Sequence, residues 1–178
     1  MCSSDLSSVP FPDPADALRE QERARQGCQL CKLSKSRTNI AFGSGNARAR
    51  LLVVGEGPGE EEDKQGLPFV GRAGQLLTKM LASVGFDRER DCYIANVVKC
   101  RPERNRNPEP DEVAACSPFL MAQIDTIGPH VILALGNFAA QTLLGTKEGI
   151  TRLRGKTYQY RASVLVPTFH PAFLLRNP

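Results

Sequence analysis

The chain has 178 residues, a length typical of a single domain. Hydrophobic residues make up 41% of it and charged residues 24%, which excludes a disordered or fibrous chain. Twenty-three Lys and Arg against nineteen Asp and Glu give a net charge of +4, which permits a polyanionic partner without requiring one. No apolar run is long enough to span a membrane, and the N-terminus lacks the features of an export signal. We expect a cytoplasmic protein that does not associate with membranes.

The first residues differ in composition from the rest of the chain. Residues 1–12 are rich in Ser and Pro and are expected to form a flexible tail, which leaves 13–178 as a single domain. Asp13 followed by Pro14 is typical of an N-cap and a first helical position, and predicts a charged helix that runs to about Gln26.

Apolar patterning and turn residues predict the remaining elements. In chain order these are a strand at 51–54, a polar Gly-rich loop at 56–71, an amphipathic helix at 75–83, a strand at 93–98, a loop at 101–111, a helix at 111–127 that is kinked or restarted at Ser117-Pro118, a strand at 131–135, a helix at 137–144 and a terminal hairpin of 158–160 with 164–166. Alternating strands and helices predict an α/β protein with helices on both faces of a mostly parallel sheet.

Polar residues follow each predicted strand. In open parallel sheets a ligand binds beyond the carboxyl ends of the strands, so these residues are expected to converge on one crevice. They are the loop that begins at Gly55-Glu56-Gly57, Asn96 near the end of the second strand, Gly136-Asn137 and His170. The loop does not match a dinucleotide fingerprint, since Glu60 stands where a glycine is required, and its acidic run would repel a pyrophosphate.

The two histidines lie at opposite ends of this predicted sheet. His130 precedes the third strand and is therefore expected on the side away from the crevice. His170 follows the last strand within Thr168-Phe169-His170-Pro171, which places its imidazole in the crevice. His170 is the histidine that we expect to act in the site.

Six cysteines lie at positions 2, 28, 31, 92, 100 and 116. Cys28 and Cys31 form a tight knuckle, whereas Cys100 and Cys116 form a wider pair, which favours an iron–sulfur cluster over a structural zinc ion. Zinc and buried structural thiols remain alternatives. For Cys2 and Cys92 the structural interpretation is preferred, since one lies in the predicted tail and the other starts a strand.

Several separated motifs occur together, in an order that resembles family 4 uracil-DNA glycosylases. They are Cys28-x2-Cys31, GEGPGEEED (55–63), GLPFVGRAGQLL (66–77), YIANVVKCRP (93–102), Cys116 and HPAFLLRNP (170–178). The resemblance covers roughly residues 25–178. It implies a three-layer α/β/α fold, here with a central, mostly parallel four-stranded sheet, and a monofunctional enzyme that hydrolyses the bond between uracil and deoxyribose in DNA.

The same resemblance implies roles for individual residues. A [4Fe–4S] cluster would be held by four cysteines: Cys28, Cys31, Cys100 and Cys116. His170 would donate a hydrogen bond to uracil O2, and Glu56 or Glu62 would face the sugar or orient water. The resemblance implies that Glu62 positions the attacking water while Glu56 and Gly57 line the pocket, but the sequence itself does not rank the two carboxylates. The base would be bound by three residues: Gly57, Phe69 and Asn96. Asn96 would pair with uracil N3–H and O4, and Phe69 would stack on the flipped base.

Further expectations concern DNA and the chain's end. Leu174 and Leu175 beside Arg176 resemble a wedge that enters the base stack, with the guanidinium on a phosphate. The cluster would shape a DNA-facing loop at 101–106. That loop lacks the histidine of a subgroup that bonds covalently to DNA, so no covalent capture is expected. Family members usually continue past RNP with a further helix, which suggests a truncated C-terminus. We expect a monomer that acts on single- or double-stranded DNA.

Overall fold

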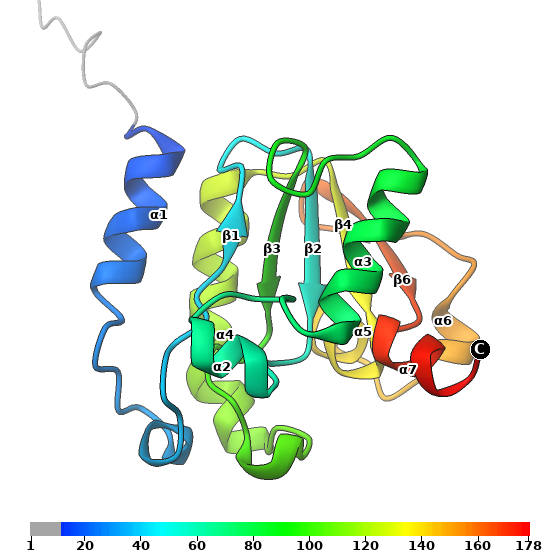
Figure 1. The fold of residues 1–178 in the computed structure, drawn as a ribbon. Coiled ribbons are helices and arrows are strands. Elements are labelled where there is room, and N and C mark those ends of the chain that lie inside the picture. Colours follow the sequence, from blue (N-terminus) through cyan, green and yellow to red (C-terminus); the bar gives the residue numbers. More distant parts are fainter. Residues whose placement is uncertain (1–11) are drawn as a thin grey trace, which may run out of the picture.

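A computed structural model describes residues 12–178 and contains one six-stranded sheet in the order β1-β3-β2-β4-β6-β5 (Figure 1). The predicted tail, apart from Pro12, and Cys2 lie outside the described residues. The four central strands pair in parallel and the two edge strands pair antiparallel. The strands are β1 (Ser44–Gly45), β2 (Leu51–Gly55), β3 (Cys92–Asn96), β4 (Val131–Leu135), β5 (Tyr158–Tyr160) and β6 (Ser163–Thr168).

Seven α-helices and two short 3-10 helices are found within the described residues. They are α1 (Pro14–Arg23), η1 (Lys32–Lys35), α2 (Glu60–Gln65), α3 (Arg72–Ser83), η2 (Glu103–Asn105), α4 (Pro110–Ile127), α5 (Gly136–Leu144), α6 (Ile150–Leu153) and α7 (Pro171–Arg176). No helix among residues 12–178 has the length and apolarity needed to cross a membrane.

Alternate residues of the strands face opposite sides of the sheet, and each side carries its own helices. Val53 and Ile94 pack with Leu77 of α3 on one side. On the other side, buried residues of α4 and α5 pack against the sheet residues Leu52 and Val54. Helix α1 lies outside α4, and α7 lies beside α3 (Figure 1). The three-layer α/β/α fold is therefore confirmed.

The predicted count of four strands is wrong, because the sheet has six. The four central parallel strands were expected, and β5 pairs with β6 as the predicted terminal hairpin. Strand β1 was missed because two residues carry no alternation of apolar and polar side chains. Gly45 has a φ of +114°, and a Cβ there would lie 2.3 Å from the Cys92 carbonyl oxygen, so only glycine fits beside β3.

Three helices differ from the expected ranges. The α1 N-cap is Asp13 as predicted, but the helix ends at Arg23, three residues before Gln26. Helix α2 lies within the predicted loop; its acidic residues occupy the first helical turn, where the helix dipole favours negative charge. Helix α4 continues through Pro118, so of the two expected alternatives the restart is wrong, while a kink there stays a prediction.

Candidate active site and cysteine pocket

The carboxyl ends of the parallel strands open into a cleft of about 970 Å³, as the strand order predicts. The cleft brings together residues from seven separate segments of the chain. Those predicted as site residues that line it are Glu56, Gly57, Glu62, Phe69, Asn96, His170 and Arg176. The sequence-based expectation of one shared crevice is confirmed. His130 is exposed before the amino end of β4 and does not line the cleft.

Asn96 ends β3 and is only 1% exposed, and its Oδ1 has no hydrogen-bond partner among residues 12–178. An unsatisfied buried acceptor costs about 1–3 kcal/mol, which a ligand N–H group would recover. Gly55 is its partner in register on β2. A Cβ at Gly55 would lie 2.5 Å from both Asn96 Oδ1 and Phe69 Cζ, so glycine keeps this end of the cleft open.

Phe69 closes the cleft from the loop between α2 and α3. Its side chain is 5% exposed and stacks against His170, with ring centroids 5.5 Å apart and an interplanar angle of 28°. The residue has a φ of +54°, which is unfavourable for a bulky side chain. Helix α3 can approach its backbone only because position 74 is glycine, where a Cβ would lie 2.0 Å from the Phe69 carbonyl.

His170 is the N-cap of α7, and its Nδ1 accepts a hydrogen bond of 3.0 Å from Ala172 N. Burial lowers the pKa of His170 to about 4, and the positive charge of Arg176 acts in the same direction, whereas Glu62 opposes the shift. The imidazole is therefore neutral at pH 7. With Nδ1 occupied as an acceptor, its proton lies on Nε2.

The two candidate carboxylates have different environments. Glu62 Oε1 accepts from the backbone N–H groups of Val70 and Gly71, at 2.9 and 2.8 Å. That oxygen therefore fixes the loop that carries Phe69, while Oε2 accepts from no group in the described part of the chain. Glu56 is partly buried, and its burial raises the pKa of its carboxyl. A carboxylate with a raised pKa in a cleft is a candidate for catalytic work.

Helix α7 contributes to the cleft, but not through the expected leucines. Arg176 lines it, whereas Leu174 and Leu175 do not, although Leu175 is 39% exposed. Three aromatic residues that were not expected line it instead: Phe138, Phe169 and Phe173. Phe169 and Phe173 stack with ring centroids 4.7 Å apart. The spacing of four residues between Phe169 and Phe173 was the available signal, obscured because it crosses the start of α7.

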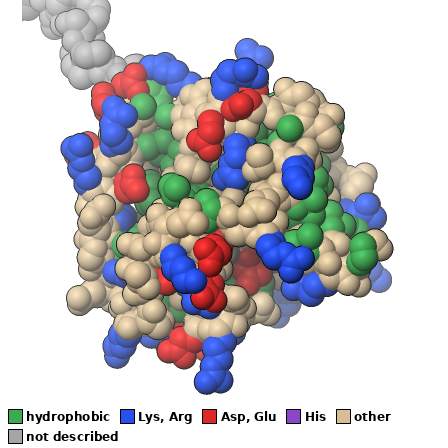
Figure 2. Space-filling model, in the orientation of Figure 1, with side chains coloured by type: hydrophobic (Ala, Val, Ile, Leu, Met, Phe, Trp, Pro, Cys, Tyr) green, Lys and Arg blue, Asp and Glu red, His purple; other side chains and the backbone are tan. Residues whose placement is uncertain are grey.

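The loop at 101–106 carries three arginines, of which two are held by the protein itself. Arg106 donates to both carboxylate oxygens of Glu112, a fully buried residue, at 2.9 and 2.6 Å. Arg101 donates to Asn105 Oδ1 at 2.8 Å. The side chain of Arg104 is exposed, and the residue has a φ of +53°. Among the described residues Arg104 forms no ion pair. On the face in Figure 2, basic and acidic side chains are interspersed rather than gathered into one basic patch.

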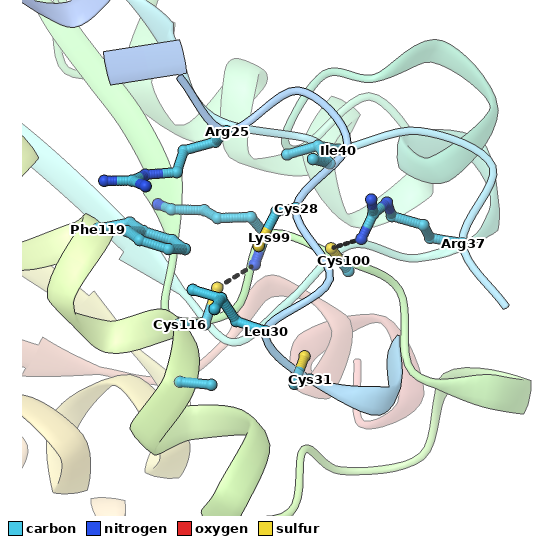
Figure 3. A pocket seen from close by; sticks show the side chains of 11 residues that line it. Arg25, Cys28, Leu30, Cys31, Arg37, Ile40, Lys99, Cys100, Cys116 and Phe119 are labelled. Carbon is cyan, nitrogen blue, oxygen red and sulfur yellow. Dashed lines mark hydrogen bonds between the residues drawn. The ribbon is translucent and has the colours of Figure 1, made fainter. Parts of the chain in front are cut away.

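A second, mostly apolar pocket lies between three parts of the chain: the segment 25–40 that follows α1, the segment after β3, and helix α4. Figure 3 shows the four predicted ligand cysteines around it: Cys28, Cys31, Cys100 and Cys116. Arg37 Nη1 lies 3.5 Å from Cys100 Sγ, and the Lys99 backbone N–H donates to Cys116 Sγ at 3.2 Å. Cys92 is buried elsewhere, at the start of β3, as its position suggested.

Lys99 is an unusual buried residue at 2% exposure. Its Nζ donates to the Asn96 carbonyl at 2.9 Å and to Gln123 Oε1 at 2.5 Å, and no carboxylate in residues 12–178 pairs with it. Burial lowers the pKa of Lys99 to about 8. A cation buried this deeply calls for a compensating negative charge, and the cysteine pocket lies beside it. Across the described residues, no three His, Cys, Asp or Glu side chains are grouped to hold a single metal ion.

Comparison with known proteins shows the family to which the chain belongs. Residues 42–178 match the model of the uracil DNA glycosylase superfamily. The chain is 53% identical over 158 residues to a type-4 uracil-DNA glycosylase of Thermotoga maritima, covering 88% of this chain and 81% of that protein. It is 46% identical over 175 residues to that of Saccharolobus solfataricus, covering 93% and 79%. It is 43% identical over 171 residues to that of Archaeoglobus fulgidus, covering 92% and 85%. The chain therefore belongs to the type-4 branch of the uracil-DNA glycosylase superfamily.

Proposed function

We propose that this protein hydrolyses the N-glycosidic bond between uracil and deoxyribose in DNA, releasing uracil and leaving an abasic site. The single observation that carries the assignment to this cleft is the unpartnered Oδ1 of Asn96, buried beside an aromatic ring and a neutral histidine. Such a site offers the flipped base an acceptor, a stacking surface and a donor. The relatives named above, all type-4 uracil-DNA glycosylases, support the same reaction.

Base recognition would proceed at the Watson–Crick edge. The target nucleotide leaves the stack, since the bond to be broken is inaccessible inside a duplex. Asn96 Oδ1 accepts from uracil N3–H and its amide nitrogen donates to O4, a pattern that cytosine does not match. Phe69 stacks on the base, and Gly57 lets the backbone approach it. A Cβ on Gly57 would lie 2.7 Å from Val98 Cγ2, which shows how tightly this segment is packed.

Bond cleavage places negative charge on the leaving uracil and positive charge on the sugar. Neutral His170 donates its Nε2–H to uracil O2, which stabilises the developing anion. Glu62 Oε2 and the Glu56 carboxylate are the groups available to orient water or to face the sugar. No lysine lines the cleft among the described residues, so we propose a monofunctional glycosylase that leaves the DNA backbone intact.

The pocket of four cysteines would hold a [4Fe–4S] cluster. The donor set suits it, because four thiolates are the usual ligands of such a cluster. Arg37 suits it as well, since a cluster held by four thiolates is anionic and the guanidinium lies beside Cys100 Sγ, while the backbone N–H of Lys99 donates to Cys116 Sγ. When bound, the cluster crosslinks the segment after α1, the segment after β3 and helix α4. Uracil hydrolysis transfers no electrons, so its contribution is structural.

DNA would be contacted by Arg104 in the loop at 101–106 and by three residues of α7: Leu174, Leu175 and Arg176. Of these, Arg176 lines the cleft and Arg104 is exposed beside it. The wedge role of the two leucines stays a prediction. A monomeric state, a cytoplasmic location and the tolerance for single or double strands also stay predictions.

The test is incubation of purified protein with an oligonucleotide that contains one uracil, followed by analysis of free base and of strand cleavage after alkali. We expect release of uracil and a strand break only after alkaline treatment. Two rival functions give other results. A lesion sensor would bind the oligonucleotide without releasing uracil, and an iron–sulfur electron carrier would show a reversible redox couple but no dependence on uracil.

A further inference from the structure

Arg88 lies outside every motif described above, yet its side chain reaches the loop that carries Phe69. It belongs to the turn between α3 and β3, and its side chain is only 15% exposed. Nη1 donates to the Phe69 carbonyl at 2.7 Å and to Thr78 Oγ1 at 2.9 Å, while Nη2 donates to the Pro68 carbonyl at 3.0 Å. One guanidinium therefore binds two consecutive carbonyls and α3.

Phe69, whose carbonyl accepts from Arg88, is held in an unfavourable backbone conformation. Phe69 has a φ of +54°, which non-glycine residues rarely adopt and which persists only where surrounding contacts enforce it. Arg88 binds the carbonyl side of this segment, and Glu62 binds the amide groups of Val70 and Gly71 that follow. Charged side chains from two distant segments therefore fix the loop on both sides of Phe69.

The turn that presents Arg88 is itself closed by hydrogen bonds. Asp87 N donates to Asp91 Oδ2 at 2.8 Å, and Asp87 Oδ1 accepts from the N–H groups of Glu89 and Arg90, each at 2.9 Å. Asp91 N in turn donates to the Asp87 carbonyl at 2.8 Å. A turn braced in this way presents the guanidinium in one place, so the contacts to the Phe69 loop are preorganised.

We propose that Arg88 is a positioning residue for base recognition: it holds Phe69 in its left-handed conformation, so that the ring is fixed as the surface on which the flipped uracil stacks. This inference rests on the proposed function of the cleft. Arg88 itself does not line the cleft, so it acts through Phe69 and not on the substrate. Lysine would not replace it, because a single ammonium cannot reproduce a planar fork that spans two carbonyls.

The experiment is a double-mutant cycle on the single-turnover rate with a uracil oligonucleotide. The variants are Arg88→Met, Phe69→Ala and the pair together, with Arg90→Met as the matched control from the same turn, whose side chain is 74% exposed. A misplaced reaction partner costs on the order of 10²-fold, so we expect Arg88→Met to lower the rate by roughly 10- to 100-fold. The pair should be no slower than Phe69→Ala alone, and Arg90→Met should equal the parent. Multiplying effects in the pair would overturn the proposal.

A second measurement does not depend on activity. Hydrogen exchange at the Val70 and Gly71 amides, which Glu62 binds, should be faster in Arg88→Met than in the parent and unchanged in Arg90→Met. Unchanged exchange in Arg88→Met would also overturn the proposal. If Arg88→Met does not fold, Arg88→Lys serves in its place, with an expected rate below the parental rate and exchange faster than in the parent; parental values for both would overturn the role. Failure of the parent to release uracil would instead refute the proposed function, while the exchange data would still report on Arg88.

Discussion

His170 accepts a hydrogen bond from the backbone N–H of Ala172 at Nδ1, over a distance of 3.0 Å. This contact, made at the first turn of α7, decides which ring nitrogen carries the proton. Nε2 is the donor of the neutral ring, and a neutral donor suits a leaving group that becomes negative without requiring a charged histidine in a buried site.

Replacing His170 by alanine should lower the single-turnover rate by roughly 10²–10³, the usual loss when one preorganised donor to a developing anion is removed. DNA affinity should change little, because the proposed contact of the imidazole is to the base and not to the phosphates. The matched control is His130→Ala, which removes an exposed histidine at the opposite end of the sheet. Equal rates for His170→Ala and the parent would contradict the donor role.

The rate of base release should not follow the titration of an ordinary histidine. Burial and Arg176 lower the pKa of His170 to about 4, against a reference of 6.5, with Glu62 opposing the shift. The neutral donor is therefore present from pH 8 down to about pH 5, and the single-turnover rate should show no step near 6.5. A step at that pH in the parent that is absent from His170→Gln would show that His170 titrates normally.

The same shift makes stability depend on pH. The folded pKa lies below the unfolded one, so the unfolded chain binds the extra proton between about pH 6.5 and pH 4. His170 therefore destabilises the fold as the pH falls through this window and has no further effect below it. Urea unfolding should show His170→Gln losing less stability than the parent between pH 7 and pH 5. An equal loss in both proteins would contradict the shifted pKa.

Much of the fold and the location of the cleft could be predicted because local patterns determine them. Apolar runs ended by glycine, as at Leu51 to Gly55, identified the parallel strands, and the rule for open sheets then placed Asn96 and His170 in one cleft. Helix α2 was missed because four acidic residues read as a solvated loop. Their preference for a helix N-terminus was the neglected signal.

Other features depend on contacts between distant segments, which no local pattern encodes. Arg88 reaches Phe69 across nineteen positions of sequence, and nothing in the residues around either one indicates the contact. Arg106 was expected to face DNA with the rest of its loop, but it is bound to Glu112 instead. Whether a charged side chain pairs internally or stays free is decided by tertiary packing.

Loading with a cluster should be visible directly. We expect anaerobically purified protein to be brown, with broad visible absorption that bleaches on reduction, and to contain about four iron atoms per chain. Cys116→Ala should lose the colour and much of the stability, since Cys116 lies in the pocket and is buried in α4. Cys92→Ala, the matched control, removes a buried thiol elsewhere and should stay brown. A colourless protein with stoichiometric zinc and full activity would contradict the cluster.

Alanine substitutions of two arginines in the loop at 101–106 should differ in their effects on DNA binding and on stability. Arg104→Ala should weaken binding to DNA of any sequence and reduce the salt dependence of the affinity by about one counterion, because it removes a free exposed cation. Arg106→Ala should mainly lower stability, because it leaves the buried Glu112 carboxylate without its partner. Thermal unfolding and binding at several salt concentrations separate the two. The reverse assignment of effects would place Arg106 at the phosphates.

The choice of the base that the protein excises should depend on the amide of Asn96. Asn96→Asp keeps the shape of the side chain but replaces the amide donor by a second oxygen, which faces uracil O4 unfavourably and can accept from the N4 amino group of cytosine. The variant should therefore lose most of its activity on uracil and gain a weak activity on cytosine, measured as single-turnover release of each base. Asn96 lies four residues from Cys100, so visible absorption must show that the cluster is retained in the variant. A folded, cluster-loaded Asn96→Asp protein that excises uracil at the parental rate would show that the amide donor of Asn96 has no part in reading the base.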